Sequence, residues 1–210
     1  MNMENYKQYF TKEYLMGPNS LRLLGEIITD NPQAIQSGNV LDLGCGTGLE
    51  LEKYFPLCPS ARVTGIDLSE AMLNALKKKF TDKDITLIGG SYFDVPLGEN
   101  VFDAAVSVES LHHFTKDEKI PLYKKLHTAL RANGYLILTD YFAATDDEEQ
   151  THRNNLNALK AEQGIRDDEF YHYDTPLTVQ HETEALLEAG FASVQVLKSW
   201  GTTYTIKAVK

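Results

Sequence analysis

Apolar residues along this chain follow two spacings, one typical of buried strands and one typical of amphipathic helices. Short apolar runs predict strands over residues 40–43, 62–66, 85–88, 102–107 and 135–140. Apolar positions three and four residues apart predict helices over residues 20–29, about 47–55, 69–80 and 116–131. Strands that alternate with helices are typical of an α/β fold, in which helices cover both faces of a parallel sheet.

The pattern changes after the fifth strand. Residues 143–177 are polar and acidic and contain one helical stretch, which predicts an insertion that covers a substrate site. A helix over 178–189 follows, and residues 192–198 and 203–209 alternate strongly enough to predict a β-hairpin. The parallel units would therefore end in one antiparallel pair.

Length, charge and cysteine content limit the interpretation. At 210 residues we expect one domain over 1–210, a doubly wound Rossmann-like sheet with residues 1–30 as a helical cap. The net charge of −10, from 20 Lys and Arg against 30 Asp and Glu, disfavours nucleic acid as a partner. The chain shows no apolar leader and no run of about 18 apolar residues, so we expect no membrane association and a cytoplasmic protein. Cys45 and Cys58 are not expected to form a disulfide.

Residues 40–48 read Val-Leu-Asp-Leu-Gly-Cys-Gly-Thr-Gly, a strand followed by a glycine loop that opens a helix. Gly44, Gly46 and Gly48 allow a sharp turn and a close approach to a ligand. Their spacing, G-x-G-x-G, differs from the G-x-G-x-x-G of dinucleotide sites. Asp42, two residues before the first glycine, would repel a pyrophosphate by about 1 kcal/mol or more at close range.

A second acid follows the next strand. Residues 63–67 read Val-Thr-Gly-Ile-Asp, so Asp67 ends a strand beside the glycine loop. Its two oxygens match the two hydroxyls of a ribose, although capping of the next helix is the alternative. Acids around a glycine loop favour a positively charged nucleoside, and S-adenosyl-L-methionine meets that requirement. A dehydrogenase is disfavoured by the glycine spacing and by Asp42.

The chain resembles the class I S-adenosylmethionine-dependent methyltransferases over nearly its whole length after about residue 20. The matching motifs are the glycine loop, the acidic strand end, Pro96 with Phe102-Asp103, and Leu-Arg-Ala-Asn-Gly-Tyr at residues 130–135. The resemblance implies a seven-stranded sheet of order 3-2-1-4-5-7-6 with strand 7 antiparallel. It also implies S-adenosyl-L-methionine as methyl donor and S-adenosyl-L-homocysteine as product.

The resemblance further implies which residues bind the cofactor. Asp42 would reach its amino acid end, Asp67 its ribose, and Leu68 its adenine. Many members carry an acid after the glycine that follows strand 3, where it contacts the adenine amino group. This chain has Ser91 at that position, and Asp94 is the alternative residue for the adenine contact. The whole implied set is Asp42, Gly44, Cys45, Gly46, Gly48, Asp67, Leu68, Ser91, Tyr92 and Val108.

Residues 107–114, Ser-Val-Glu-Ser-Leu-His-His-Phe, are the candidates for chemistry, because strand carboxyl ends face the ligand crevice in this architecture. His112 or His113 would deprotonate an acceptor, since histidine titrates near neutral pH. We expect the two to point different ways, so that at most one faces the substrate. The alternative is that the pair orders the loop. Glu109 would bind a cationic substrate.

An aromatic stripe marks the N-terminal segment. Tyr6, Phe10 and Tyr14 recur four residues apart, which predicts a helix whose Tyr6 and Tyr14 contact the substrate or pack on the core. The insertion contains His152 and His172 without tight ligand spacing, so the sequence predicts no metal site.

The sequence thus predicts an S-adenosylmethionine-dependent methyltransferase acting on an O, N or S atom of a small molecule, as a monomer or homodimer. Methyl transfer is an in-line displacement, so alignment matters more than an indispensable base. One alternative is a tRNA- or protein-modifying enzyme. Residues 174–210 distantly resemble enzymes that make carboxy-S-adenosylmethionine, although no arginine for the added carboxylate is identified. The other alternative to a small-molecule methyltransferase is a non-catalytic module that binds the cofactor.

Overall fold

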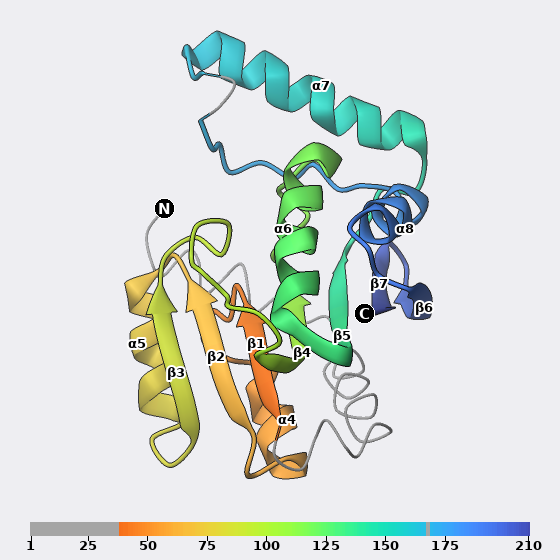
Figure 1. Ribbon diagram of the computed structural model, residues 1–210. Helices are drawn as coiled ribbons and strands as arrows, with labels where there is room; N and C mark the ends of the chain where they lie inside the picture. Colours follow the sequence, from red (N-terminus) through yellow and green to blue (C-terminus); the bar gives the residue numbers. More distant parts are fainter. Residues whose placement is uncertain (1–37, 167–168) are drawn as a thin grey trace.

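A seven-stranded sheet forms the centre of the molecule in the computed structural model, which describes residues 38–166 and 169–210 (Figure 1). Its order is β3-β2-β1-β4-β5-β7-β6, and β7 alone runs antiparallel to its neighbours β5 and β6. This confirms the predicted sheet. The strands are β1 (Asn39–Leu43), β2 (Arg62–Asp67), β3 (Asp84–Gly89), β4 (Phe102–Val108), β5 (Leu130–Tyr141), β6 (Ser193–Trp200) and β7 (Thr203–Val209).

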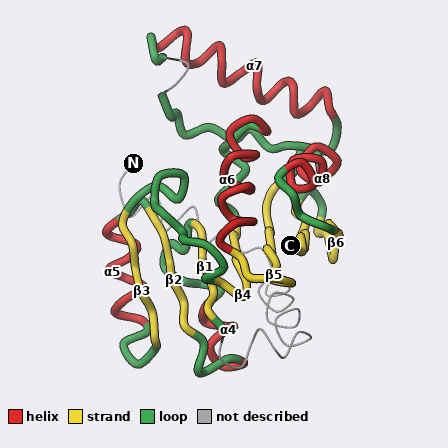
Figure 2. The backbone as a smooth tube through the Cα atoms, viewed as in Figure 1, coloured by secondary structure: helices red, strands yellow, loops and turns green. Residues whose placement is uncertain are grey.

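Helices pack on both faces of the sheet. The helices are α4 (Leu51–Leu57), α5 (Glu70–Lys79), α6 (Lys116–Ala129), α7 (Asp146–Gln163) and α8 (Val179–Glu188). Helices α4 and α5 pack on one face and α6 and α8 on the other (Figure 2). Helix α7 lies beyond the end to which the parallel strands point (Figure 1). Within the described ranges no helix has the length and apolar character needed to cross a bilayer.

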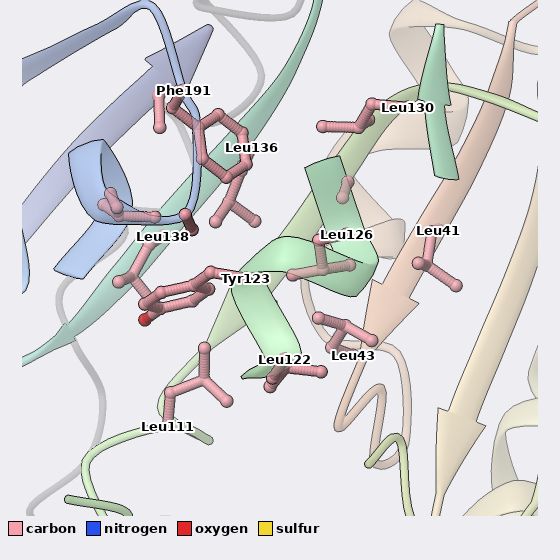
Figure 3. Close-up of a cluster of buried hydrophobic side chains, with 14 of the residues drawn as sticks. Leu41, Leu43, Leu111, Leu122, Tyr123, Leu126, Leu130, Leu136, Leu138 and Phe191 are labelled. Carbon is pink, nitrogen blue, oxygen red and sulfur yellow. The ribbon is translucent and has the colours of Figure 1, made fainter. Parts of the chain in front are cut away.

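Alternate residues of the central strands pack on opposite faces of the sheet. On β1, Val40 joins the cluster under α4 and α5, whereas Leu41 and Leu43 join the cluster under α6. Figure 3 shows Tyr123 and Leu126 of α6 between these leucines and two others, Leu136 and Leu138 of β5. Each such buried side chain stabilises the fold by about 1.5–3 kcal/mol. The near-continuous apolar strands therefore reflect a sheet buried on both faces.

A buried ion pair joins α6 to α8. Lys119 Nζ lies 2.5 Å from Glu182 Oε2, and the Tyr123 hydroxyl donates to the other oxygen of the same carboxylate. Removal of one partner from such a pair costs about 3–5 kcal/mol, because the remaining charge is left buried. The pair fixes the start of α8, and with it the chain that leads into α8 from α7.

Two predicted helices have different bounds in the structure. The helix after the glycine loop begins only at Leu51, because Gly48 takes a left-handed conformation (φ 68°) and the chain turns before it becomes helical. The helix expected to reach residue 131 ends earlier, because Leu130 already pairs with Phe102 in the sheet. The helix predicted over 20–29 lies outside the described residues.

Candidate functional site

The loop between β1 and α4 contains three glycines in the left-handed region. Gly44, Gly46 and Gly48 have φ values of 71°, 49° and 68°. A Cβ at Gly44 would lie 2.1 Å from Ser110 Oγ, so this glycine lets the loop pack against the chain after β4. A Cβ at Gly46 would meet nothing nearer than 3.9 Å. Ser110 therefore fills the space beside Gly44, on the β4 side of the loop, whereas no described residue fills the space beside Gly46 and a ligand can approach the backbone there.

Asp67, the last residue of β2, holds this loop in place. Its Oδ2 accepts a hydrogen bond from Gly46 N (2.9 Å), and its Oδ1 accepts one from Ser69 N (2.8 Å). Each carboxylate oxygen can accept more than one hydrogen bond, so Asp67 can order the loop and also accept from a ribose. Leu68 follows with 69% of its surface exposed, which leaves it free to contact a ligand.

Two buried carboxyl groups lie beneath the loop. Asp42 is 1% exposed, and a side-chain hydrogen bond joins it to Glu50, the residue before α4. Burial, followed by the charge of Glu50, raises the pKa of Asp42 well above its usual range. Among the described residues, Asp42 Oδ2 and Glu50 Oε1 have no hydrogen-bond partner. A cationic group arriving here would meet an unpaired acceptor.

Cys45 and Tyr92, both predicted to bind the cofactor, use their side chains in packing. The Cys45 thiol fills the space that a side chain at Gly65 would need, because a Cβ there would lie 2.8 Å from Sγ. The Tyr92 hydroxyl donates to the Ser110 carbonyl oxygen (3.1 Å). Burial raises the pKa of both groups. Both side chains are buried, so contact of Cys45 and Tyr92 with a ligand is expected through their backbones.

Ser91 and Val108 lie at the carboxyl ends of β3 and β4. Ser91 accepts a hydrogen bond from Phe93 N (3.2 Å) through its hydroxyl, which makes it a turn residue. Val108 is the last residue of β4 and is half-buried. Both stand at the sheet end that carries the glycine loop.

The chain after β4 begins with a strained residue. Glu109 has φ 50°, and its N–H donates to the Thr139 carbonyl oxygen (2.9 Å). Both of its carboxylate oxygens are buried, and neither has a hydrogen-bond partner within the described ranges. Burial, followed by the charge of Asp140, raises the pKa of Glu109 to about 8. Strain and an unpaired buried acid at one position are typical of functional sites.

His112 is held by an acid from the neighbouring strand. Its Nδ1 lies 2.5 Å from Asp140 Oδ1, and Asp140 Oδ2 accepts from Leu111 N (2.8 Å). Burial opposes the charged form of Asp140, but the charge of His112 and the hydrogen bond between the two side chains lower the pKa of Asp140 overall. Burial likewise disfavours charge on His112, yet Asp140 raises the pKa of His112 overall. The imidazole is thereby fixed with Nε2 pointing away from β5.

A second acid approaches both histidines from the insertion. Asp174 Oδ1 lies 3.0 Å from His113 Nδ1 and 3.6 Å from His112 Nε2. The prediction that the histidines point different ways is therefore wrong, because both face one carboxylate. Thr175 N donates to the His112 carbonyl oxygen (2.7 Å), and the His172 ring lies 4.2 Å from that of His113. The contact with His113 lowers the pKa of Asp174. We call Glu109, His112, His113, Asp140 and Asp174 the polar cluster.

Sequence reasoning missed Glu50, Asp140 and Asp174. The sequence did carry a signal for Asp140, because it is an acid near the carboxyl end of a predicted strand, β5, in the same way that Asp67 is an acid at the end of β2. Asp174 carried no such signal, because it is one of many acids in the insertion. Tyr6 and Tyr14 lie outside the described residues.

The glycine loop, Asp67 and the polar cluster all lie at the carboxyl ends of parallel strands. Ligands of open α/β sheets bind at this end, at the point where the strand order reverses. Here β1 pairs with both β2 and β4, so the reversal falls at the glycine loop. Fold and site together define an α/β protein whose glycine loop and polar cluster lie at the same end of the sheet, where ligands of such folds bind.

The sequence comparisons identify the family. A family model described as a methyltransferase domain matches residues 40–134. Carboxy-S-adenosyl-L-methionine synthase of Wolinella succinogenes is 32% identical over 194 residues, covering 83% of this chain and 77% of that protein. The chain spans half or less of the length of several other curated relatives. It belongs to the class I S-adenosylmethionine-dependent methyltransferases, enzymes whose cofactor is S-adenosyl-L-methionine.

Solved structures share the fold. A 1,6-didemethyltoxoflavin-N1-methyltransferase of Burkholderia thailandensis, with 1,6-didemethyltoxoflavin and S-adenosylhomocysteine bound, superposes with a TM-score of 0.66 at 18% identity, over 99% of this chain and 83% of that one. Human N-acetylserotonin methyltransferase in complex with S-adenosylmethionine gives 0.60 at 20% identity, over 90% of this chain and 54% of that one. At these identities the likeness establishes the fold, and the acceptor has to be argued from the site.

Proposed function

We propose that the protein transfers a methyl group from S-adenosyl-L-methionine to an O, N or S atom of a small molecule. The observation that carries this proposal is the position of Ser110. Its side chain packs against Gly44 of the glycine loop, and its neighbour Glu109 opens the polar cluster. A cofactor on the loop would therefore lie next to buried groups that can hold an acceptor.

The residues present fit the cofactor. Gly46 leaves its Cβ position open, which suits close approach of the ligand to the backbone. The unpartnered, buried Oδ2 of Asp42 suits the ammonium of the amino acid end, and Asp67 keeps lone pairs for the ribose. Leu68 is exposed for contact with the adenine. The bound cofactor supplies an electrophilic methyl group on a sulfonium that leaves as a neutral thioether.

The polar cluster supplies the acceptor side. Glu109 would accept a hydrogen bond from the O–H, N–H or S–H of the acceptor, because its oxygens are buried without a partner. His112 and His113 would form the wall of the pocket, oriented by Asp140 and Asp174. The insertion that supplies Asp174 would cover the pocket and exclude water, which leaves alignment as the main task of the site.

Calorimetry tests the cofactor, and a turnover screen tests the acceptor. S-adenosyl-L-homocysteine should bind and a nicotinamide dinucleotide should not; the reverse result would refute the proposal. Small-molecule acceptors are then incubated with S-adenosyl-L-methionine, and release of S-adenosyl-L-homocysteine is measured. Glu109→Gln should lower kcat/KM while cofactor affinity stays within twofold, and exposed Glu188→Gln serves as the matched control. Tight cofactor binding without turnover of any acceptor would favour a non-catalytic module.

A second candidate is synthesis of a carboxylated cofactor, favoured by the 32% identity to the Wolinella succinogenes protein. Asp140 and Asp174 argue against it, because both have lowered pKa values and their charges would repel an added carboxylate. Mass spectrometry of the nucleoside that copurifies with the protein separates the two functions. A nucleoside heavier than S-adenosyl-L-methionine by one carboxyl group would support the second candidate. Salt-dependent binding of tRNA would instead favour a nucleic-acid substrate.

A further inference from the structure

Three side chains that commonly bind metals converge at the edge of the polar cluster. His112 and His113 come from the chain after β4, and Asp174 comes from the far end of the insertion. Their ligand atoms all lie within 4.8 Å of one another. We propose that His112 Nε2, His113 Nδ1 and Asp174 Oδ1 bind one divalent first-row transition-metal ion.

The distances fit a shared ion better than a hydrogen-bond network. The 3.6 Å between His112 Nε2 and Asp174 Oδ1 is too long for a hydrogen bond. His113 Nδ1 lies 3.0 Å from the same oxygen but is not aligned to donate to it. Two ligands about 2.1 Å from one metal are ~3.0 Å apart at 90° and ~3.6 Å apart at 120°. Both separations are therefore those of neighbouring ligands around one ion.

The His112–Asp140 contact completes this arrangement. Histidines that bind a metal usually donate their other ring N–H to a carboxylate, which fixes the ring and the tautomer. Here Asp140 Oδ1 lies 2.5 Å from His112 Nδ1, so Nε2 is left to face Asp174. The buried acid thus orients the ligand atom that the proposed site requires.

Charge balance gives an independent reason for a cation. Glu109, Asp140 and Asp174 bring three carboxylates together, and both oxygens of Glu109 are buried without a partner in the described part of the chain. Glu109 lies in a second group of metal-ligating side chains that shares His112 with the first. Buried unpartnered acids are costly unless a cation or a hydrogen-bond donor offsets them. A divalent ion beside Glu109 would offset this negative charge.

The ligand set points to the class of metal. Imidazole favours Zn²⁺, Fe²⁺, Co²⁺ and Ni²⁺ over Mg²⁺ and Ca²⁺, which prefer oxygen ligands. Two histidines and one carboxylate leave coordination positions open. An open position next to Glu109 would take the O, N or S atom of the acceptor. This last role rests on the proposed function, whereas metal binding itself does not.

Titration with Co²⁺ tests the site without any turnover assay. Tag-free full-length protein is stripped with a chelator and titrated while visible absorption is recorded. One Co²⁺ per chain should give the bands of a low-symmetry N/O site, and Zn²⁺ should displace it. Asp174→Asn and His113→Ala should each abolish stoichiometric binding. Asp140→Asn, which leaves all three proposed ligands in place and weakens the contact that orients His112, should lower affinity by about 10–100-fold.

His127→Gln is the control, because His127 lies at the end of α6 against Phe191, apart from the cluster. It should bind Co²⁺ as the parent protein does. Thermal melts of every variant confirm that it is folded, and the His113 variant replaces the Asp174 variant if the latter fails to fold. No binding by the parent protein, or equal binding by the Asp174 and His127 variants, overturns the proposal. If S-adenosyl-L-homocysteine still binds and methyl transfer proceeds in such samples, the metal inference alone fails.

Discussion

Replacement of Asp67 by asparagine separates two tasks assigned to one carboxylate. The structure gives Asp67 hydrogen bonds from Gly46 N (2.9 Å) and Ser69 N (2.8 Å), and the proposed cofactor site adds the ribose hydroxyls. Asparagine has nearly the same shape but only one acceptor oxygen, and its NH₂ group would face an N–H donor. The variant therefore loses one loop bond and weakens the ribose contact.

The size of each loss follows from the charge of the carboxylate. A hydrogen bond to a charged group contributes about 1.5–3 kcal/mol, and the lower end applies to the loop bond because Asp67 is half-buried. We expect the free energy of unfolding to fall by about 1–2 kcal/mol. We expect affinity for S-adenosyl-L-homocysteine to fall by about 1.5–3 kcal/mol, or roughly 10–150-fold.

Urea unfolding and calorimetric titration measure the two effects on the same samples. Asp82→Asn is the control, because that side chain is 77% exposed and should change neither quantity. If stability falls while affinity stays within twofold of the parent protein, Asp67 only orders the loop and the ribose assignment is wrong. If neither quantity changes, the argument from the two backbone hydrogen bonds also fails.

Two further predictions concern the glycine loop and the acids beneath it. Gly44→Ala should destabilise the protein more than Gly164→Ala by about 1 kcal/mol or more in thermal unfolding. Both glycines have positive φ (71° and 67°), but a Cβ at Gly44 would lie 2.1 Å from Ser110 Oγ, whereas a Cβ at Gly164 would meet no atom of the described residues within 4 Å. Equal losses would show that this contact does not matter. Because burial, followed by the charge of Glu50, raises the pKa of Asp42, we expect the free protein to hold a proton there that a bound cation displaces. Below that raised pKa, affinity for S-adenosyl-L-methionine should rise with pH by up to about tenfold per pH unit, and it should level off above it. In Glu50→Gln the rise should move to lower pH, because the charge of Glu50 is removed while the burial of Asp42 remains. Calorimetry across pH in two buffers of different ionisation enthalpy measures the proton release, and a flat profile in the parent protein would exclude the shared proton.

Much of the fold could be predicted because the sheet is buried on both faces. Strands such as β1 and β4 carry nearly continuous apolar runs, and alternation in β6 and β7 identified the terminal hairpin. The glycine loop and Asp67 were predictable for a similar reason, since their chemistry is compressed into short local motifs. Local sequence also singled out Glu109 and the histidine pair, which the structure brings together in the polar cluster, while their contact with an acceptor stays a prediction.

The rest of the site depends on contacts between distant segments. Asp174 meets His112 and His113 only because α7 and the chain after it return over the carboxyl ends of the strands. Nothing in the periodicity of an acidic segment distinguishes this carboxylate from its exposed neighbours. The bounds of α4 were missed because the left-handed conformation of Gly48 delays the helix, which the apolar spacing does not encode.

A crystal structure with S-adenosyl-L-homocysteine tests the central claim most directly. The account predicts that the adenosyl group lies across the glycine loop, with the ribose hydroxyls hydrogen-bonded to Asp67 and the sulfur directed toward Glu109. An adenosyl group bound elsewhere, or a sulfur turned away from the polar cluster, would contradict it.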